Sequence, residues 1–346
     1  MRESDIRDPS MVERFFKSED EWLTQFVHNG STVDEKYTVD VPCPCCGEHH
    51  GDKLFVKQYF CFEQCPECGT IYVNKRFSEE RLNSYYATRE SRLNYHNVLS
   101  ANSNEEYRIN SIFLPRVGYI REVMRSAGAD FGADQQLLDI GCASGQFLTC
   151  LQSLENSPKL FGAEASRDLA AIAKLKIPNA EIIGSPFRSE DFRSQAMDIV
   201  TVWEVIEHVF DPYTFLKDVA EVIRPGGHLF LSVPNIEGFD IQILWDGGNA
   251  FSPPSHLNYF RKSSINRLLE RVGLKVVDIA TPGKLDVDIV RNRIKANPEA
   301  QGRLGGYFTK AFLSDSAEDA SLCEKLQEII RLSGLSSHMI VSCRKL

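Results

Sequence analysis

The chain of 346 residues lacks any apolar run that approaches the roughly 18–20 residues of a membrane-spanning helix. Its first residues, MRESDIRDPSMVERFF, are charged from the second position and contain no apolar middle of a secretory signal. Positive charge is also scarce, because 39 Lys and Arg stand against 48 Asp and Glu and leave a net charge of −9. These absences predict a cytoplasmic protein without membrane contact. They also disfavour nucleic acid as a partner, since phosphate-binding proteins usually carry a basic face.

The remaining composition is that of an ordinary globular protein, with 42% apolar and 25% charged residues. The length allows two or three domains. We predict a helical lead-in over 1–36, in which Ser18 is a possible N-cap, and a cysteine-rich ribbon over 37–76. A helical cap or linker should follow over 77–132, and an α/β domain over 133–346, with a helical insertion at 283–335.

Four of the ten cysteines follow a spacing that is typical of zinc ribbons. Cys43, Cys46, Cys65 and Cys68 form C-x2-C-x18-C-x2-C, and a proline and a glycine tighten each pair into a knuckle. In a reducing compartment, such cysteines indicate metal binding rather than disulfides. Four thiolates leave no open position on Zn²⁺, so the spacing predicts a structural ion. A catalytic metal or a chance cluster are the alternatives, and the nearby spare ligands are Cys45, Cys61, His49 and His50.

From residue 135 on, short apolar runs alternate with amphipathic segments. QQLLDIGC and HLFLSVPN are typical of buried strands, and RDLAAIAKLK and KSSINRLLERVG of helices. The segment DPYTFLKDVAEVIRPGG predicts a helix that ends at the Gly-Gly pair. Alternating strands and helices indicate an α/β fold with a parallel sheet covered on both faces.

A glycine turn joins the first of these strands to the first helix. In LLDIGCASGQFL, residues 137–148, a strand ends at Asp139, turns through Gly141 and Gly145, and opens a helix. The spacing differs from the G-x-G-x-x-G fingerprint of nicotinamide-binding proteins. Glycine here permits a sharp turn and a close approach of a ligand to the helix start.

This stretch resembles motif I of class I S-adenosylmethionine-dependent methyltransferases. The resemblance covers about 135–282 and returns for the last strand. Further blocks agree in order: Glu164 ends the second strand, MDIVTVWEVIEHVFDP resembles the fourth-strand motif, and IRPGGHLFLSVPN resembles the helix, turn and strand that follow. The resemblance implies a Rossmann-like, seven-stranded methyltransferase domain, preceded here by the small zinc-binding ribbon and the helical segment.

The resemblance also implies that S-adenosylmethionine is the cofactor. Glu164 would bind both ribose hydroxyls, and Asp139 would stabilise the glycine turn or reach the amino group of the cofactor. Ser185 stands where many relatives place an Asp for the adenine amino group. Trp203 and Glu204 follow the fourth strand at the sheet edge where ligands of such folds bind. The expected cofactor-binding residues are therefore Asp139, Gly141, Gly145, Glu164, Ser185, Trp203 and Glu204.

Candidate catalytic residues are His256, His208 and Tyr259. His256 lies in SPPSHLNYFRKSSINRLLE, which resembles the H-x-x-[YF]-[FS] element of small-molecule methyltransferases in this superfamily. A base is required only when the methyl acceptor carries a proton that must leave. His256 is predicted as base or substrate ligand, with a loop-anchoring role as the alternative, and His208 suits a structural hydrogen bond better.

The order of ribbon, Tyr-rich helices and methyltransferase domain also resembles enzymes that methylate nucleotide-linked sugars. We therefore predict a small-molecule substrate, either a sugar or a nucleotide sugar. The alternatives are an RNA methyltransferase that grips nucleic acid through the ribbon and a non-catalytic adaptor whose ribbon binds a protein. Tyr85, Tyr86 and Tyr95 are expected either to line the acceptor pocket or to pack in the core.

Overall fold

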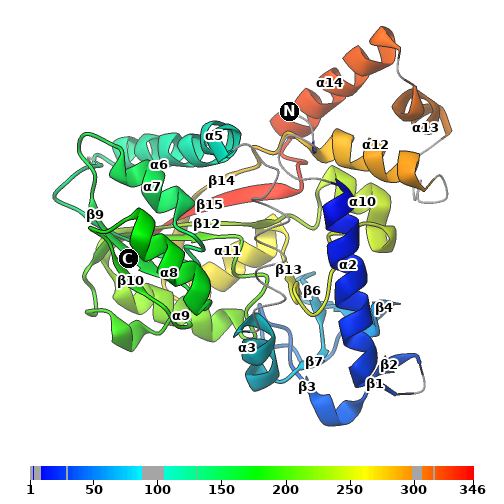
Figure 1. Ribbon diagram of the computed structural model, residues 1–346, viewed down its shortest axis with the longest axis horizontal. Helices are drawn as coiled ribbons and strands as arrows, with labels where there is room; N and C mark the ends of the chain where they lie inside the picture. The colour runs from blue at the N-terminus through cyan, green and yellow to red at the C-terminus, as the bar shows by residue number, and fades with distance from the viewer. Residues whose placement is uncertain are drawn as a thin grey trace.

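The computed structural model describes residues 3, 9–28, 30–87, 105–129, 131–297, 306–314 and 316–346. Figure 1 shows a central sheet between two layers of helices, with the N-terminal ribbon beside it and three helices of the C-terminal part extending away from it. Tyr95, one of the pocket candidates, lies outside the described residues. Among the described residues, no helix combines the length and the apolar character that a membrane crossing requires.

The central sheet has seven strands in the order β10-β9-β8-β11-β12-β15-β14, as predicted for this class. Neighbouring strands from β10 to β12 run parallel, whereas β15 is antiparallel to β12 and β14. The strands are β8 (Gln136–Ile140), β9 (Lys159–Ala163), β10 (Glu181–Ile183), β11 (Met197–Trp203), β12 (Ile223–Pro234), β14 (Leu274–Ala280) and β15 (His338–Lys345).

Helices cover both faces of this sheet because its inner strands are apolar on both sides. Leu137 and Ile199 pack into one buried cluster with α6 and α7, whereas their neighbours Leu138 and Val200 pack into another with α9 and α11. The helices of the domain are α5 (Glu105–Arg108), α6 (Leu114–Ser126), α7 (Gln146–Gln152), α8 (Arg167–Lys176), α9 (Pro212–Val222), α10 (Phe239–Leu244) and α11 (Lys262–Arg271).

Two predicted helix boundaries are wrong. Helix α9 ends at Val222, before the Gly-Gly pair, because Ile223 already pairs with Met197 of β11 and the chain continues as β12. In the lead-in, Ser18 lies inside α2 (Pro9–Leu23) and does not cap it. The pairing of Ile223 with β11 thus ends α9 before the Gly-Gly pair, and the start of α2 at Pro9 places Ser18 inside that helix.

The N-terminal ribbon consists of short antiparallel strands. They are β1 (Val27–His28), β2 (Thr32–Val33), β3 (Thr38–Asp40), β4 (Asp52–Lys57), β5 (Phe60–Gln64), β6 (Ile71–Val73) and β7 (Lys75–Phe77), and α3 (Glu79–Ala87) follows them. In Figure 1 the ribbon occupies the blue to cyan part of the chain, beside α2. Its core is aromatic and includes the buried Phe60, Phe62 and Phe77.

The ribbon is joined to the methyltransferase-like domain by backbone pairing. Strand β13 (Asn258–Tyr259) comes from the domain but pairs antiparallel with β6, so that one sheet has the order β13-β6-β5-β4. Val73 N–H also donates to the carbonyl of Leu257 at 3.0 Å. The residues that directly follow the candidate base His256 therefore form an edge strand of the ribbon sheet.

Between β14 and β15 the chain forms a separate helical layer. Its helices are α12 (Asp286–Ala296), α13 (Gly306–Leu313) and α14 (Ala317–Leu332), which occupy the region of the predicted insertion. They share a small core that contains Val290, Ile294, Phe312 and Ile330. Figure 1 shows this layer at the upper right, away from the ribbon strands.

Candidate active site

The glycine turn between β8 and α7 has the backbone conformation that the sequence predicted. Gly141, Ala143 and Gly145 have φ angles of 76°, 48° and 79°. A Cβ on Gly141 would lie 2.5 Å from Val205 Cγ2, and one on Gly145 would lie 2.5 Å from Ile177 Cδ1. Both positions therefore require glycine for space as well as for conformation.

Glu164, at the end of β9, holds this turn. One carboxylate oxygen accepts the N–H of Ala143 at 3.0 Å, and the other accepts the N–H of Ser166 at 2.7 Å. The side chain is buried with the turn. A carboxylate has about four acceptor positions, so each oxygen can accept more than one hydrogen bond.

Asp139 lies beneath the turn, at the end of β8. Its carboxylate accepts a hydrogen bond from Thr201 Oγ1 at 2.6 Å. Burial raises the pKa of Asp139 to about 7, although the hydrogen bond of Thr201 and the charge of Arg116 act in the opposite direction. The sequence did not indicate Thr201, whose position in β11 becomes relevant only through the register of β8 and β11.

Trp203 and Glu204 lie at the carboxyl end of β11, as predicted. The guanidinium of Arg116 lies 4.6 Å from the centre of the Trp203 ring. Glu204 has a left-handed backbone, with φ 52°, although it is not glycine, and such strain is found mainly at functional sites. Its Oε1 lies 3.2 Å from His338 Nδ1 and 3.9 Å from Arg116.

The charges around Glu204 lower its pKa by more than burial raises it. Burial alone opposes ionisation, but the nearby His338 and the charge of Arg116 hold the pKa of Glu204 below its ordinary value. The carboxylate is therefore ionised at neutral pH. Sequence reasoning missed both Arg116 and His338, because Arg116 precedes the predicted start of the domain at 133 and His338 begins the last strand.

Ser185 lies after β10, half-buried, and its hydroxyl donates to the carbonyl of Pro186 at 3.4 Å. The neighbouring Phe187 stacks on Phe192 and meets Phe215 edge to face. Phe187 is thus packed against the core of the α9 face.

Glu207, His208 and His256 form a cluster beyond the end of β11. Their ligand-type atoms all lie within 4.8 Å of one another, and the two imidazole rings are 4.7 Å apart between centroids. His208 comes from the loop that follows β11, and His256 from the segment before β13. Burial lowers the pKa of His256, so this ring is neutral at neutral pH.

The loops that carry this cluster are fixed by two buried residues that the sequence did not reveal. The guanidinium of Arg76 donates to the carbonyls of Val73, Phe210 and Leu257 and to the side chain of Asn258. The Asn258 amide in turn donates to the carbonyl of Val209 at 2.8 Å. Arg76 lies on β7, so a ribbon side chain ties the two histidine-bearing loops together.

Tyr259 lies in the core, and its hydroxyl is used for structure. It donates to the carbonyl of His256 at 2.9 Å and accepts the N–H of Ser252 at 3.3 Å. Tyr86 of α3 is the tyrosine that reaches the cluster: its hydroxyl donates to the carbonyl of Ser255 at 2.8 Å and lies 3.4 Å from His208 Nδ1. Tyr85 instead contacts Glu19 of α2.

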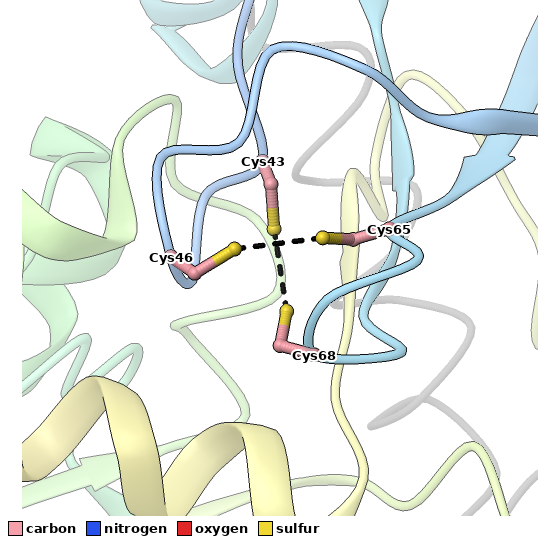
Figure 2. Close-up of side chains that lie close together, drawn as sticks. All are labelled: Cys43, Cys46, Cys65 and Cys68. Carbon is pink, nitrogen blue, oxygen red and sulfur yellow. Dashed lines mark hydrogen bonds between the residues drawn. The ribbon is translucent and has the colours of Figure 1, made fainter.

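The four predicted zinc ligands form a second cluster, at the tips of the ribbon knuckles (Figure 2). The sulfurs of Cys43 and Cys68 are 3.5 Å apart, as are those of Cys46 and Cys65. Sulfurs that each lie about 2.3 Å from a tetrahedral ion are separated by about 3.8 Å, so the donor set fits Zn²⁺.

The spare ligands lie outside this group. Cys45 is buried and donates from Sγ to the carbonyl of Ser264 at 3.1 Å, which docks the first knuckle on α11. His50 is exposed and lies 3.5 Å from Asp52. Cys61 and His49 are likewise not part of the four-cysteine group.

Comparisons with known proteins agree with the central domain. Residues 113–279 match the family model described as a methyltransferase domain. The chain is 31% identical to a ubiquinone biosynthesis O-methyltransferase of Cronobacter sakazakii over 134 residues, which are 37% of this chain and 51% of that enzyme. It is 26% identical to the enzyme of the same name from Coxiella burnetii over 193 residues, which are 51% of this chain and 78% of that one.

Among solved structures, an S-adenosylmethionine-dependent methyltransferase from Archaeoglobus fulgidus is similar, with a TM-score of 0.42 and 14% identity, over 66% of this chain and 94% of that one. The chain spans about half the length of the Cronobacter relative. The family model that matches residues 113–279, together with the strand order of the central sheet, identifies this part of the chain as a class I methyltransferase domain, of the type that uses S-adenosylmethionine. The resemblance inferred from the glycine turn is confirmed.

The residues around the turn fit this cofactor. The glycines allow the tight left-handed turn at the start of α7, and the two oxygens of Glu164 lie beside this turn, where ribose hydroxyls can donate to them. Glu204 supplies a negative charge at the neighbouring strand end, which suits a positive sulfonium.

Proposed function

We propose that this protein transfers a methyl group from S-adenosylmethionine to a polar small molecule, and that the acceptor is a sugar or a nucleotide-linked sugar. The observation that carries the proposal is the grouping of polar side chains beyond β11. Glu207, His208 and His256 share one cluster, and Tyr86 of α3 contacts it from the N-terminal part. Such groups suit an acceptor with many hydroxyls better than an apolar one.

In this proposal the cofactor is held by Asp139, Gly141, Gly145, Glu164, Ser185, Trp203 and Glu204. When bound, S-adenosylmethionine supplies an activated methyl group on a positive sulfonium. The chain contributes alignment, because the glycine turn and Glu164 hold the cofactor while the loops after β11 and before β13 hold the acceptor. His256 and His208 bind the acceptor hydroxyl or accept its proton, which must leave before the oxygen can act as a nucleophile.

Tyr259 has no part in the proposed chemistry. Its hydroxyl is buried and engaged by two backbone groups, and burial raises its pKa well above the ordinary value. Its role is to support the His256 segment from below. The site residues proposed to act on the acceptor are thus the two histidines.

We also propose that Cys43, Cys46, Cys65 and Cys68 bind a structural Zn²⁺. Their sulfurs are arranged for one tetrahedral ion, and the ribbon is too small to be stable through its core alone. The ion would fix the knuckles between which β4, β5 and β6 form their sheet.

The first test is calorimetry of the purified, zinc-loaded protein with S-adenosylhomocysteine. Glu164→Ala should bind about 10- to 100-fold more weakly, because it removes the ribose contact and leaves two backbone N–H groups without an acceptor. Glu181→Ala is the control, since Glu181 is an exposed carboxylate at the start of β10, ion-paired with Lys159.

Transfer of labelled methyl groups to nucleotide sugars, free sugars and RNA then identifies the acceptor class. Methylation of RNA alone would overturn the small-molecule proposal. If folded protein binds no S-adenosylhomocysteine, even with acceptors present, the adaptor alternative is correct instead.

A further inference from the structure

Both histidines of the Glu207–His208–His256 cluster are anchored through the same ring nitrogen. His208 Nδ1 lies 2.7 Å from the carbonyl oxygen of Ser255, and His256 Nδ1 lies 3.1 Å from that of Ala250. Because a carbonyl oxygen can only accept, each Nδ1 carries the hydrogen and each Nε2 carries a lone pair. Metal-binding histidines are commonly oriented by such a hydrogen bond at the other nitrogen.

Glu207 adds a buried carboxylate to these two lone pairs. Its side chain is 1% exposed, and its Oε1 lies 3.9 Å from His208 Nε2. Its Oε2 is buried and accepts no hydrogen bond from any residue that the structure describes. The cluster thus brings two imidazole rings and a carboxylate, three side chains that can each donate an electron pair to a metal, within 4.8 Å of one another.

We propose that Glu207, His208 and His256 bind a divalent transition-metal ion, in addition to the zinc proposed at the four cysteines. Two imidazole nitrogens and one carboxylate oxygen are a common donor set for Zn²⁺, Co²⁺ and Fe²⁺. Two ligands that each lie about 2.1 Å from one ion are separated by up to about 4 Å, which is close to the spacing of this cluster. Three protein ligands leave coordination positions open.

Glu204 favours, through its negative charge, the binding of a cation at this cluster over an arrangement that is held together by hydrogen bonds alone. Its carboxylate, paired with His338, adds a second negative charge in the same loop. A divalent ion would offset the repulsion between these two neighbouring carboxylates and supply the positive partner that a buried carboxylate requires.

The role of the ion rests on the proposed function, whereas its binding does not. Its open positions would take a hydroxyl oxygen of the acceptor, and its charge would lower the pKa of that hydroxyl, so that the proton is released to water. The histidines would then act as ligands rather than as bases. This arrangement selects acceptors with two adjacent oxygens that can chelate the ion, such as the neighbouring hydroxyls of a sugar.

The test uses the full chain with zinc already bound at the cysteines, and titrates it with Co²⁺. Cobalt bound by nitrogen and oxygen gives weak visible bands without the thiolate charge-transfer bands that displacement of zinc from the cysteines would produce. The wild type should take up one further equivalent of Co²⁺ with such bands, and metal analysis should find two ions per chain. Uptake of no ion beyond the cysteine zinc would overturn the proposal.

His256→Asn and His208→Asn keep an amide N–H that can reach the anchoring carbonyl but remove the Nε2 ligand. Each should weaken Co²⁺ binding by at least tenfold, whereas His228→Asn, at a buried histidine of β12 outside the cluster, should not change it. Unchanged affinity in the cluster variants would contradict the assignment.

Titration of every variant with S-adenosylhomocysteine separates the two proposals. Loss of Co²⁺ binding with the cofactor site intact assigns the ion to the cluster. If wild-type protein binds S-adenosylhomocysteine but no second ion, the proposed function stands and the metal site is wrong. If a histidine variant fails to fold, Glu207→Gln and the wild-type stoichiometry decide the question.

Discussion

The two clusters of ligand-type side chains differ in the atoms they offer and in how the chain assembles them. The cysteine cluster comes from two tight knuckles within one small ribbon, and its four sulfurs would close the coordination shell of a zinc ion. The Glu207–His208–His256 cluster has only three ligands and comes from loops at two different strand ends. One arrangement is suited to hold a fold together, and the other is suited to hold a ligand.

The comparison also shows that the first cluster supports the second. Strand β6 of the ribbon pairs with β13, two residues beyond His256, and Arg76 of β7 ties the β11 loop to the same segment. The ribbon is therefore expected to position the side of the proposed site that holds the acceptor. The proposed cofactor side is made by β8, β9 and α7, from residues of the α/β domain alone.

The largest expected effect comes from Cys65→Ser. Loss of one thiolate should lower the zinc content to near zero and unfold the ribbon, since small zinc domains derive most of their folding free energy from the ion. Hydrogen exchange should then accelerate at β6 and in residues 256–260, and Co²⁺ binding at the histidines should disappear.

Cys61→Ser is the matched control for this change, because Cys61 lies on β5 outside the cluster. His256→Asn is the reverse experiment and should leave the zinc content at one per chain. Retained Co²⁺ affinity in Cys65→Ser would show that the ribbon does not support the second cluster.

A smaller effect is expected for Arg76→Met. This change removes the hydrogen bonds that join β7 of the ribbon to the loop after β11 and to the segment before β13, without altering either cluster. Several buried carbonyls would lose their donor, so the free energy of unfolding should fall by about 3 kcal/mol or more. Zinc should remain bound, whereas Co²⁺ binding at the histidines should weaken.

The neighbouring Lys75→Met serves as the control, since Lys75 is exposed and paired with Glu35. Urea unfolding and Co²⁺ titration of both variants provide the measurements. Equal behaviour of the two variants would mean that Arg76 fills space without positioning the loops.

The smallest effect is expected for Asp139→Asn, on the cofactor side. Burial raises the pKa of Asp139 from 3.8 to about 7, so the unfolded chain loses this proton at a lower pH than the folded one. Stability contributed by the protonated carboxyl is therefore full below about pH 4 and is lost as the pH rises to about 7. Asparagine does not titrate, so the variant should lack this part of the dependence of the free energy of unfolding on pH.

The measurement is urea unfolding of both proteins at pH 5 and pH 8. The variant should gain stability relative to the wild type at pH 8, and both metal clusters should be unaffected. An identical pH dependence of the two proteins would exclude Asp139 as the titrating group.

The features that the sequence predicted well are those that depend on residues close together in the chain. The knuckles of Cys43 and Cys65, the glycine turn at Gly141 and the apolar strands each depend on spacing within a few positions. Glu164 was singled out because the family resemblance implies an acidic residue at this strand end, although its bonds to Ala143 and Ser166 could not be foreseen.

The features that were missed depend on the register of distant segments. Arg76 in isolation looks like an exposed basic residue, and only the fold surrounds it with carbonyls. The pairing of β13 with β6 involves two residues and leaves no periodic signal. The strained backbone of Glu204 and its pairing with His338 arise from the junction of β11 with β12 and β15, which no local pattern encodes.

The pairing of β6 with β13 has a consequence for how this ribbon meets other molecules. An unpaired strand edge invites addition of a strand from another chain, either as recognition or as aggregation. Here the edge of β6 is covered by the chain's own backbone, and the opposite edge, β4, carries the exposed charges of Asp52 and Lys53, which are of the kind that discourage such pairing. The ribbon is thereby protected against strand exchange and built into the rest of the protein, so that transferring it alone to another protein would expose the unpaired edge of β6.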